Sequence, residues 1–339
     1  MRTAIILFNL GGPDRPEAIK PFRINLFSDK AIIRAPIFIR FWLARLIAAS
    51  SAKAAVANYT LLGGKSPLLA HTEAQGRALE AALGPDYKCF PVMRYWHPLA
   101  HEVAPLVKSW KPDRILLLPL YPQFSTTTTG SSLNDWREAA TNAGLACPTA
   151  TLCCWHDDPG YTAAIAALVD EQISAAQTAL PGAKLRILYS AHGLPESIVK
   201  GGDPYQAHIE ASVAAVQSQL AENRHEHVIC YQSRATPQKW LSPSTVEALE
   251  QAGRDKVAVV VVPIAFVSDH IETLVELDIE NRHLAREAGV AGYFRARAPN
   301  DDPAFITAVA GIVKRAAASG LCRAGTLCQG HRHCPWSTR

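Results

Sequence analysis

The sequence contains no apolar run of about 18 residues, no cluster of lysines and arginines that could follow a phosphate backbone, and no GxGxxG or P-loop pattern. The first absence excludes a membrane-spanning helix. The second, with a formal net charge of only +4, argues against nucleic acid as a partner. The third leaves no support for a bound nucleotide. The 339 residues are 48% hydrophobic and 19% charged, which is typical of a folded protein with a large core.

Apolar segments of strand length alternate with alanine-rich helical segments. The expected strands cover residues 3–10, 88–93, 114–121, 149–155, 185–191, 227–231, 257–266 and 292–296. This alternation predicts an α/β fold of two similar doubly wound, Rossmann-like lobes, each a parallel sheet flanked by helices, with the active-site cleft between them. We expect lobes at 1–160 and 161–302, a helix at 303–319 that packs back on the first lobe, and a cysteine-rich tail at 320–339.

The N-terminal segment MRTAIILFNLGGPD has a short apolar run but no small-residue cleavage site after it. We interpret it as the first strand and expect a cytoplasmic protein. Residues 31–49 are rich in aliphatic and aromatic side chains and contain Arg34, Arg40 and Arg45. This pattern suits a helix that lies on a membrane surface. A core helix with arginines at its rim explains it equally well.

A histidine follows one of the expected strands. The segment LYSAHGLPESIVKGGDPY, residues 188–205, starts as a buried strand and then carries glycines and prolines, and His192 lies where the strand ends. In α/β folds, ligands bind at the carboxyl ends of the strands. The position therefore makes His192 a candidate site residue, although a single histidine is often structural.

A second strand end carries a histidine and several carboxylates, in PIAFVSDHIETLVELDIE, residues 263–280. Asp269 and Glu272 fit a helix start in which the aspartate caps the helix and the glutamate reaches back. Capping does not explain Glu276 and Glu280, which continue a series of carboxylates at a spacing of four. Such a series either faces water or holds protons or cations. With His270 beside it, the pattern is consistent with divalent-metal binding and proton transfer.

Other strand ends carry aromatic and basic side chains. They suggest a pocket for a large aromatic ligand with anionic edges. The residues are Arg94, Tyr95, Trp96, Tyr121, Phe124, Arg234 and Trp240.

These segments together resemble the ferrochelatases, enzymes that insert ferrous iron into protoporphyrin IX to make protohaem in haem biosynthesis. The resemblance is carried, in chain order, by NLGGPD, SPL, RYWHP, LYPQFSTTTTGSSLN, LYSAHGLPESIVKGGDPY, CYQSR with KWL, and PIAFVSDHIETLVELDIE. It covers residues 3 to about 319. It implies a lyase whose substrates are protoporphyrin IX and Fe(II), and it implies that residues 31–49 form a hydrophobic lip on the inner face of a membrane.

The resemblance also implies residue roles. His192 and Glu272 would be catalytic and would meet the substrate iron, with His192 either accepting a pyrrole proton or ligating the metal. Asp269, His270 and Glu276 would support the site. The residues implied to bind porphyrin are Arg94, Tyr95, Tyr121, Gln232, Ser233, Arg234 and Trp240.

The C-terminal tail contains Cys322, Cys328 and Cys334, evenly spaced by six. Eight cysteines in a cytoplasmic chain favour a metal or cluster over disulfides, and zinc is one candidate. The tail resembles that of ferrochelatases with a 2Fe-2S cluster, although its spacing differs from the animal pattern. The resemblance implies a fourth, upstream ligand. Cys154 or Cys153 is the expected residue, and Cys147 is the next candidate.

Several alternatives stay open at this point. The substrate could be coproporphyrin or another metal, and the chain could be a haem or metal carrier without catalysis, or an iron-sulfur sensor. The sequence does not determine the oligomeric state, a homodimer included.

Overall fold

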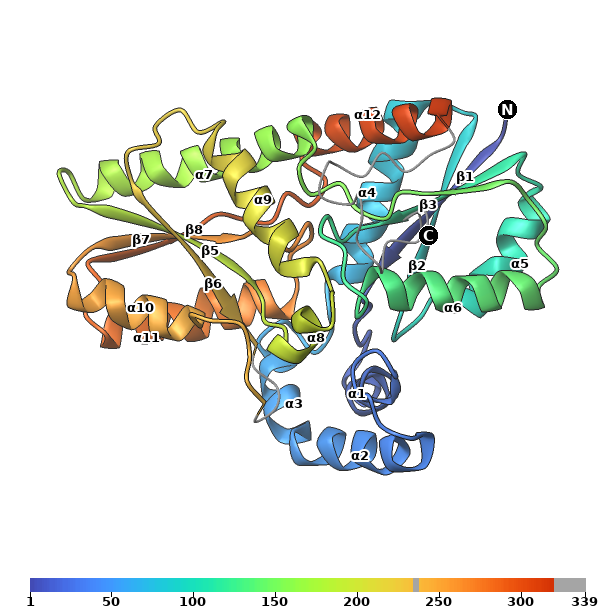
Figure 1. The fold of residues 1–339 in the computed structure, drawn as a ribbon, viewed down its shortest axis with the longest axis horizontal. Helices are drawn as coiled ribbons and strands as arrows, with labels where there is room; N and C mark the ends of the chain where they lie inside the picture. The colour runs from blue at the N-terminus through green and yellow to red at the C-terminus, as the bar shows by residue number, and fades with distance from the viewer. Residues whose placement is uncertain (234–237, 320–339) are drawn as a thin grey trace. The chain divides into compact units, whose positions relative to one another are not determined.

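The computed structural model describes residues 1–233 and 238–319 of the chain. The chain divides into two compact units. The first contains Met1–Cys154 and the part of the last helix from Ala310 onwards, and the second contains Trp155–Val309. Figure 1 shows the fold of the chain.

The first unit contains a parallel four-stranded sheet in the order β2-β1-β3-β4. Its strands are β1 (Thr3–Asn9), β2 (Tyr87–Met93), β3 (Arg114–Pro119) and β4 (Thr149–Thr151). The central strand β1 is buried along its whole length because strands flank it and helices cover both of its faces. β4 is shorter than the strand expected at 149–155. After Thr151, the amide of Leu152 donates to the Leu117 carbonyl of β3 (2.9 Å).

Helices α4 (Leu68–Leu83), α5 (Ala100–Trp110) and α6 (Thr129–Asn142) cover the two faces of the first sheet. Helices α1 (Ile19–Ser28), α2 (Ile37–Ser50) and α3 (Ala52–Thr60) pack against one another, and a short 3-10 helix, η1 (Pro16–Ala18), precedes α1. On one face, Ala4, Ile6 and Phe8 of β1 share a core with α5 and α6. On the other face, Leu7 lies against Gly76 of α4. This alternation is what a strand buried on both sides requires.

The second unit repeats the arrangement, with a parallel sheet in the order β6-β5-β7-β8. Its strands are β5 (Leu185–His192), β6 (Glu226–Gln232), β7 (Ala258–Pro263) and β8 (Gly292–Arg295). Its helices are α7 (Pro159–Ala179), α8 (Glu196–Lys200), α9 (Tyr205–Gln217), α10 (Thr245–Arg254) and α11 (Arg282–Glu287), and a π-helix, η2 (Glu272–Asn281), precedes α11. In Figure 1, α7 and α9 lie on one side of this sheet and α10 and α11 on the other. The two parallel sheets with flanking helices confirm the predicted fold class.

The last helix, α12 (Pro303–Ser319), starts in the second unit and ends in the first. Within the first unit, Arg114 of β3 donates a hydrogen bond to the Ala317 carbonyl of α12 (2.7 Å). The first unit is therefore formed from both ends of the described chain.

Candidate active site

His192 and Glu272 meet at the carboxyl edge of the second sheet. His192 is the last residue of β5, and Glu272 is the first residue of η2, which follows β7. Nδ1 of His192 lies 3.0 Å from Oε2 of Glu272, although the two residues are 80 positions apart in the sequence. β5 and β7 are neighbouring parallel strands, so the segments that follow them start at the same edge of the sheet. The fold thereby pairs the two residues that the sequence indicated as catalytic.

The charges of this pair determine which atom of His192 carries a hydrogen. Burial alone would raise the pKa of Glu272, but His192 and His270 hold it well below its usual range, so Glu272 is ionised. Burial alone would lower the pKa of His192, and the nearby Glu272 carboxylate raises it above the ordinary value. An ionised carboxylate only accepts hydrogen bonds, so Nδ1 of His192 carries the hydrogen. The neutral ring then presents a lone pair on Nε2, which can accept a proton or bind a metal ion.

His270 holds Glu272 from the other side. The imidazole is buried; its Nδ1 donates to the Ser268 carbonyl (3.0 Å), and its Nε2 lies 3.8 Å from Oε2 of Glu272. The backbone N–H of His270 also donates to Oγ1 of Thr273 (2.9 Å), which fixes the start of η2. Glu272 therefore lies between two imidazoles, and only one of them, His192, is substantially exposed.

Glu276, one step further along η2, is held by the end of β6. Its carboxylate accepts hydrogen bonds from the backbone N–H of Ser233 (2.9 Å), the Ser233 hydroxyl, and Nε2 of Gln232 (3.2 Å). Ser233 adopts a left-handed backbone conformation, with φ at 63°. Burial and the charge of Glu272 raise the pKa of Glu276. Within the series of carboxylates Glu272, Glu276 and Glu280, called the carboxylate ladder below, Glu276 therefore holds a proton better than Glu272 does.

Gln232 and Ser233, which the resemblance implied to contact porphyrin, both bond to the carboxylate of Glu276. Gln232 also donates to the backbone carbonyl of Glu272 (3.1 Å). Their contact with porphyrin stays a prediction. Arg234, the next residue, lies outside the described residues.

The carboxylate series is built on a π-helix, where an α-helix with an aspartate cap was one expectation. The Asp269 side chain does not cap η2; it is bound by Arg295 and Asn300. π-Helices are rare and occur frequently at functional sites. Along η2, Glu272 and Glu276 are partly buried and Glu280 is exposed. The series therefore leads from His192 to solvent.

Trp240 approaches the loop after His192. The backbone of Pro195 pairs with that of Trp240, and a Cβ on Gly193 would lie 2.7 Å from the Gln232 carbonyl oxygen and 3.2 Å from the Trp240 ring. Only glycine fits there. The loop therefore places one predicted porphyrin-contact residue, Trp240, beside the strand end that carries His192.

Arg94 and Tyr95, predicted to bind porphyrin, lie in the first unit and contact Asp29. Nη2 of Arg94 is 3.0 Å from Oδ2 of Asp29, its Nε donates to Ser131 (2.7 Å), and the Tyr95 hydroxyl donates to the same Asp29 oxygen (2.7 Å). Tyr95 is fully buried. Nη1 of Arg94 lies 3.5 Å from Asp135, and its side chain is partly exposed. Of these two residues, Arg94 retains the surface needed to contact a ligand.

Tyr121, also predicted to bind porphyrin, follows β3 in the same unit. Burial raises the pKa of its hydroxyl, so Tyr121 is a neutral side chain at physiological pH.

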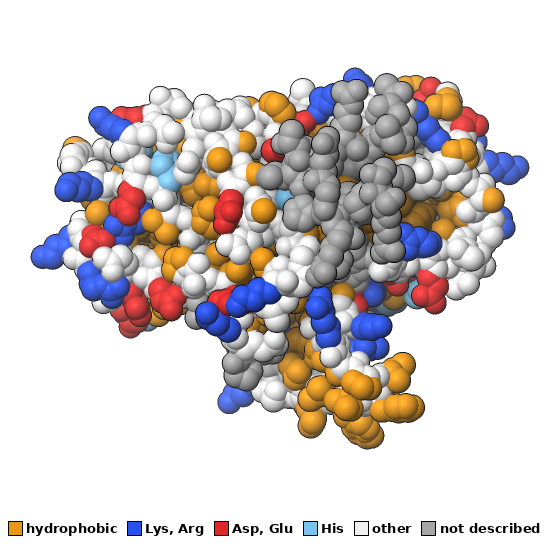
Figure 2. Space-filling model, viewed as in Figure 1, with side chains coloured by type: hydrophobic (Ala, Val, Ile, Leu, Met, Phe, Trp, Pro, Cys, Tyr) orange, Lys and Arg blue, Asp and Glu red, His pale blue; other side chains and the backbone are white. Residues whose placement is uncertain are grey.

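An exposed apolar surface covers α2. Phe38 and Trp42 are 81% and 66% exposed, whereas the residues that α2 buries are the small Ala44 and Ala48. Figure 2 shows hydrophobic side chains gathered over this helix. The exposed apolar residues of α2 are Ile37, Phe38, Ile39, Phe41, Trp42, Leu43 and Leu46. Large side chains outside and small ones inside are the reverse of a core helix, so the core-helix alternative is wrong.

One arginine lies over this surface. The Arg45 guanidinium lies 3.4 Å from the centre of the Phe41 ring. None of the described helices is long and apolar enough to pass through a bilayer.

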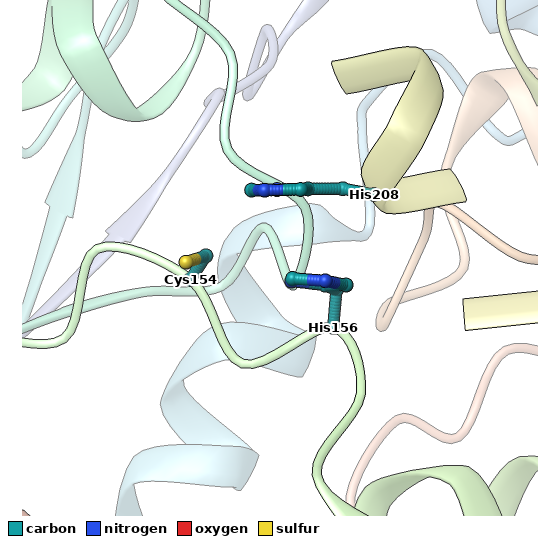
Figure 3. Close-up of side chains that lie close together, drawn as sticks. All are labelled: Cys154, His156 and His208. Carbon is teal, nitrogen blue, oxygen red and sulfur yellow. The ribbon is translucent and has the colours of Figure 1, made fainter. Parts of the chain in front are cut away.

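Two upstream cysteines lie together after β4. Cys153 and Cys154 are buried, and their sulfur atoms are 3.7 Å apart. His156 and His208 are buried in the second unit with their rings stacked, 3.9 Å between centroids and 8° between planes. Figure 3 shows this stack with Cys154, two residues before His156 in the chain, and one donor atom from each of the three lies within 4.8 Å of the others.

Neither histidine was a predicted site residue. The sequence CCWH at residues 153–156 was the available signal, because two thiols and an imidazole fall within four positions. Cys147 lies apart, with its sulfur 3.4 Å from the Pro112 carbonyl. Cys322, Cys328 and Cys334 lie outside the described residues.

Comparison with known structures supports the same architecture. The sirohydrochlorin chelatase SirB from Bacillus subtilis subspecies spizizenii, solved in complex with cobalt, has a TM-score of 0.55 over 94% of this chain and 96% of its own, at 10% sequence identity. SirB from Bacillus subtilis with Fe3+ gives a TM-score of 0.53 at 11% identity, covering 94% of this chain and 97% of that one. At these identities the likeness concerns the fold alone.

Comparison of sequences is more specific. The ferrochelatase family model matches residues 2–317. The ferrochelatase of Caulobacter vibrioides is 48% identical over 318 residues, covering 92% of this chain and 90% of that protein. The ferrochelatase of Phenylobacterium zucineum is 48% identical over 340 residues, covering 99% and 96%. With its histidine and carboxylates on the second sheet and a family match along nearly its whole length, the chain belongs to the ferrochelatase family.

Proposed function

We propose that this chain is a metal-inserting lyase that places ferrous iron in protoporphyrin IX to form protohaem, in haem biosynthesis. Family membership supports the reaction class. The observation that carries the proposal is the hydrogen-bonded pair of His192 and Glu272 at the end of β5.

The reaction has clear chemical requirements. Two pyrrole N–H bonds break, the iron forms bonds to all four ring nitrogens, and two protons leave; no electrons are transferred. The ion must also shed its water molecules. The enzyme therefore needs a base with a lone pair directed at the porphyrin and a route that removes protons.

His192 supplies that lone pair. With Nδ1–H bound to Glu272, Nε2 of the neutral ring accepts a pyrrole proton or ligates the entering iron. When Nε2 is protonated, the Glu272 carboxylate stabilises the imidazolium, as a carboxylate does for a catalytic histidine. We assign His192 and Glu272 as catalytic, and Asp269, His270 and Glu276 as supporting residues.

The ladder on η2 supplies the route. The raised pKa of Glu276 lets this carboxylate take a proton that the ionised Glu272 does not retain. Glu280, at the exposed end of the series, leads to solvent. A series of carboxylates of this kind can transfer protons because neighbouring like charges keep one group easily protonated.

Arg94 and Trp240 are the porphyrin contacts that the described residues favour. An arginine binds the carboxylates of a porphyrin through paired hydrogen bonds, and the indole ring offers a flat apolar surface. Arg94 would exchange the weaker Asp135 contact, at 3.5 Å, for a propionate while it keeps Asp29.

The apolar surface on α2 would lie on a membrane. Its aromatic side chains would enter the headgroup boundary, and its arginines would meet anionic lipids. A hydrophobic porphyrin could then pass between the lipid and the enzyme without crossing water.

The donor atoms after β4 fit a 2Fe-2S cluster. Thiolates are the ligands that such clusters prefer, and Cys154 and Cys153 are adjacent and buried. Cys322, Cys328 and Cys334 would provide the other thiolates. When bound, the cluster would supply one-electron redox chemistry or structural support. A purified chain should be reddish, with about two iron and two labile sulfide ions per chain and bands that bleach on reduction.

Serine substitution identifies the cluster ligands. Each of the three tail substitutions and one of Cys154→Ser and Cys153→Ser should remove the colour, while Cys147→Ser should keep it. A colourless protein with bound zinc, purified without oxygen, would contradict the cluster and leave the chelatase proposal intact.

Anaerobic turnover tests the main proposal. Purified protein should convert an excess of protoporphyrin IX and Fe(II) to protohaem over many catalytic cycles. The reaction is monitored by the loss of porphyrin fluorescence. The same assay with coproporphyrin, and with Co(II), ranks the alternative substrates. Binding of one porphyrin per chain without turnover would show a carrier and refute the enzyme.

A further inference from the structure

A buried ion-pair network lies behind the candidate active site. Arg295, the last residue of β8, places Nη1 3.0 Å from Oδ1 of Asp269 and Nη2 2.7 Å from Oδ2 of Asp278. Its side chain is 8% exposed. Asn300 completes the network: its Nδ2 donates to Asp269 Oδ2 (2.9 Å), and its Oδ1 accepts from the Asp269 backbone N–H (2.8 Å).

The two carboxylates that Arg295 joins lie on either side of Glu272 in the sequence. Asp269 is in the loop that leads from β7 to His270, three residues before Glu272, and Asp278 is on η2, six residues after it. One guanidinium therefore connects the segment that enters η2 with the helix itself. A planar guanidinium can hold two carboxylates in fixed directions, which a flexible ammonium group cannot do.

The network counters two effects that would displace Glu272: the protonation of Asp269 and the repulsion between Asp269 and Asp278. Burial would protonate Asp269, but Arg295 and Asn300 lower its pKa and keep it ionised. Without Arg295, two buried or partly buried carboxylates would repel each other across the start of η2. A π-helix is also a poor stand-alone structure, so its position depends on contacts of this kind.

We propose that Arg295 is a positioning residue for metal insertion: by joining Asp269 to Asp278, it sets η2 so that the Glu272 carboxylate meets His192. Arg295 itself touches neither substrate nor the reacting atoms. The inference rests on the proposed function for its kinetic consequence, whereas its structural consequence, the His192–Glu272 distance, is independent of any activity.

The second sheet offers a matched control at its other end. Arg186 is the second residue of β5, and its side chain is also 8% exposed. Its Nη2 also joins two carboxylates, at 2.7 Å from Oε2 of Glu226 and 2.7 Å from Oδ2 of Asp255. His192 lies six residues further along the same strand. Loss of Arg186 should therefore destabilise the second unit in a similar way without moving η2.

The experiment compares Arg295→Gln, Arg295→Lys and Arg186→Gln in the full chain. For Arg295→Gln we expect kcat to fall on the order of tenfold or more, because a small misplacement of a catalytic group costs up to about a hundredfold. The porphyrin dissociation constant, from fluorescence quenching, should stay the same. Arg295→Lys keeps one ion pair and should lose less activity. Arg186→Gln should lower the melting temperature and leave kcat unchanged.

Crystal structures of the same variants give the second readout. In Arg295→Gln the Nδ1–Oε2 separation of His192 and Glu272 should exceed hydrogen-bond distance, about 3.2 Å, while Arg186→Gln should retain it. A folded Arg295→Gln variant with wild-type kcat and an intact His192–Glu272 bond would overturn the proposal. If this variant does not fold, Arg295→Lys decides: wild-type kcat and geometry there would overturn it as well. A wild-type chain without turnover would refute the proposed function and leave the structural readout valid.

Discussion

The two sheets have the same strand order and differ in the side chains at their equivalent strand ends. The central strand β1 ends at Asn9, and the central strand β5 ends at His192. Asn9 is buried and binds two neighbouring groups: its Nδ2 donates to the Thr72 hydroxyl (3.0 Å), and its Oδ1 accepts from the backbone N–H of Leu10 (2.9 Å). His192 is partly exposed and meets an ionised carboxylate. One strand end is structural and the other is suited to chemistry.

The segments that follow the neighbouring strands account for the difference. After β3, neutral hydroxyl groups such as Ser125 and Thr127 contact each other (2.8 Å) before α6 starts. After β7, the chain carries His270 and Glu272 into the π-helix. The edge of a parallel sheet therefore gathers side chains in both units. The first unit also pairs a histidine with a carboxylate after β2, His97 with Glu102 (2.8 Å), but both of these side chains are exposed, whereas Glu272 of the second unit is largely shielded from solvent. A side chain at a strand end is well placed to contact a ligand. Whether it can also transfer a proton depends on the charged groups beside it, which set its pKa.

The largest expected effect separates the two strand ends directly. His192→Ala should fold, bind porphyrin and lose metal insertion on the order of a hundredfold or more, because a positioned base is lost. Asn9→Ala should lower the free energy of unfolding by roughly 1–2 kcal/mol through a lost buried hydrogen bond, with kcat within a few-fold of wild type. The measurements are anaerobic protohaem formation and denaturant unfolding. Activity of His192→Ala close to wild type would remove the distinction between the two units.

Glu272→Gln sharpens the comparison through its pH dependence. In the wild type, His192 is neutral only above its raised pKa, so metal insertion should speed up as the pH rises through that value. The variant lacks the charge that raises the pKa of His192, so its rise should occur at lower pH. Its plateau should be about a hundredfold lower, because the imidazolium is no longer stabilised. A rise at the same pH in both proteins would show that Glu272 does not act on His192.

The same pair predicts a signed effect on stability. The raised pKa of His192 contributes stability below its ordinary value of 6.5 and loses it as the pH rises through the folded-state pKa. The lowered pKa of Glu272 contributes stability above its ordinary value of 4.5 and loses it as the pH falls through the folded-state pKa. The melting-temperature difference between wild type and Glu272→Gln should therefore be largest between these two values and smaller on both sides.

The smallest effect on turnover is expected in the first unit. Serine substitution of Ile37, Phe38 and Trp42 should weaken binding to anionic liposomes and raise the KM for porphyrin several-fold, with kcat unchanged, because both interactions use exposed apolar surface. Leu106→Ser is the control, since Leu106 is also exposed but lies on α5. Unchanged liposome binding and an unchanged KM in the triple variant would contradict the membrane proposal.

Much of the framework follows from local patterns in the sequence. Apolar runs such as residues 3–10 predict buried parallel strands, because a central strand that is covered on both faces has no face exposed to solvent and therefore needs no polar side chains. Glycines and prolines after Ala191 place His192 at a strand end. The spacing of four between Glu272, Glu276 and Glu280 predicts that these carboxylates form a series. Each of these inferences uses neighbours within one turn or one strand.

Contacts between distant segments were decided only by the tertiary structure. No local pattern shows that Asp269 binds Arg295 and Asn300 and does not cap a helix, or that Gln232 and Ser233 hold Glu276. The exposure of α2 likewise depends on which of its faces meets the neighbouring helices. The sequence by itself determined which side chains reach the edge of the second sheet, because strand ends are set locally. Which carboxylate meets His192, 80 residues away, depends on the packing of β5 against β7 and on the ion pairs behind η2, and packing energies arise only once the chain is folded.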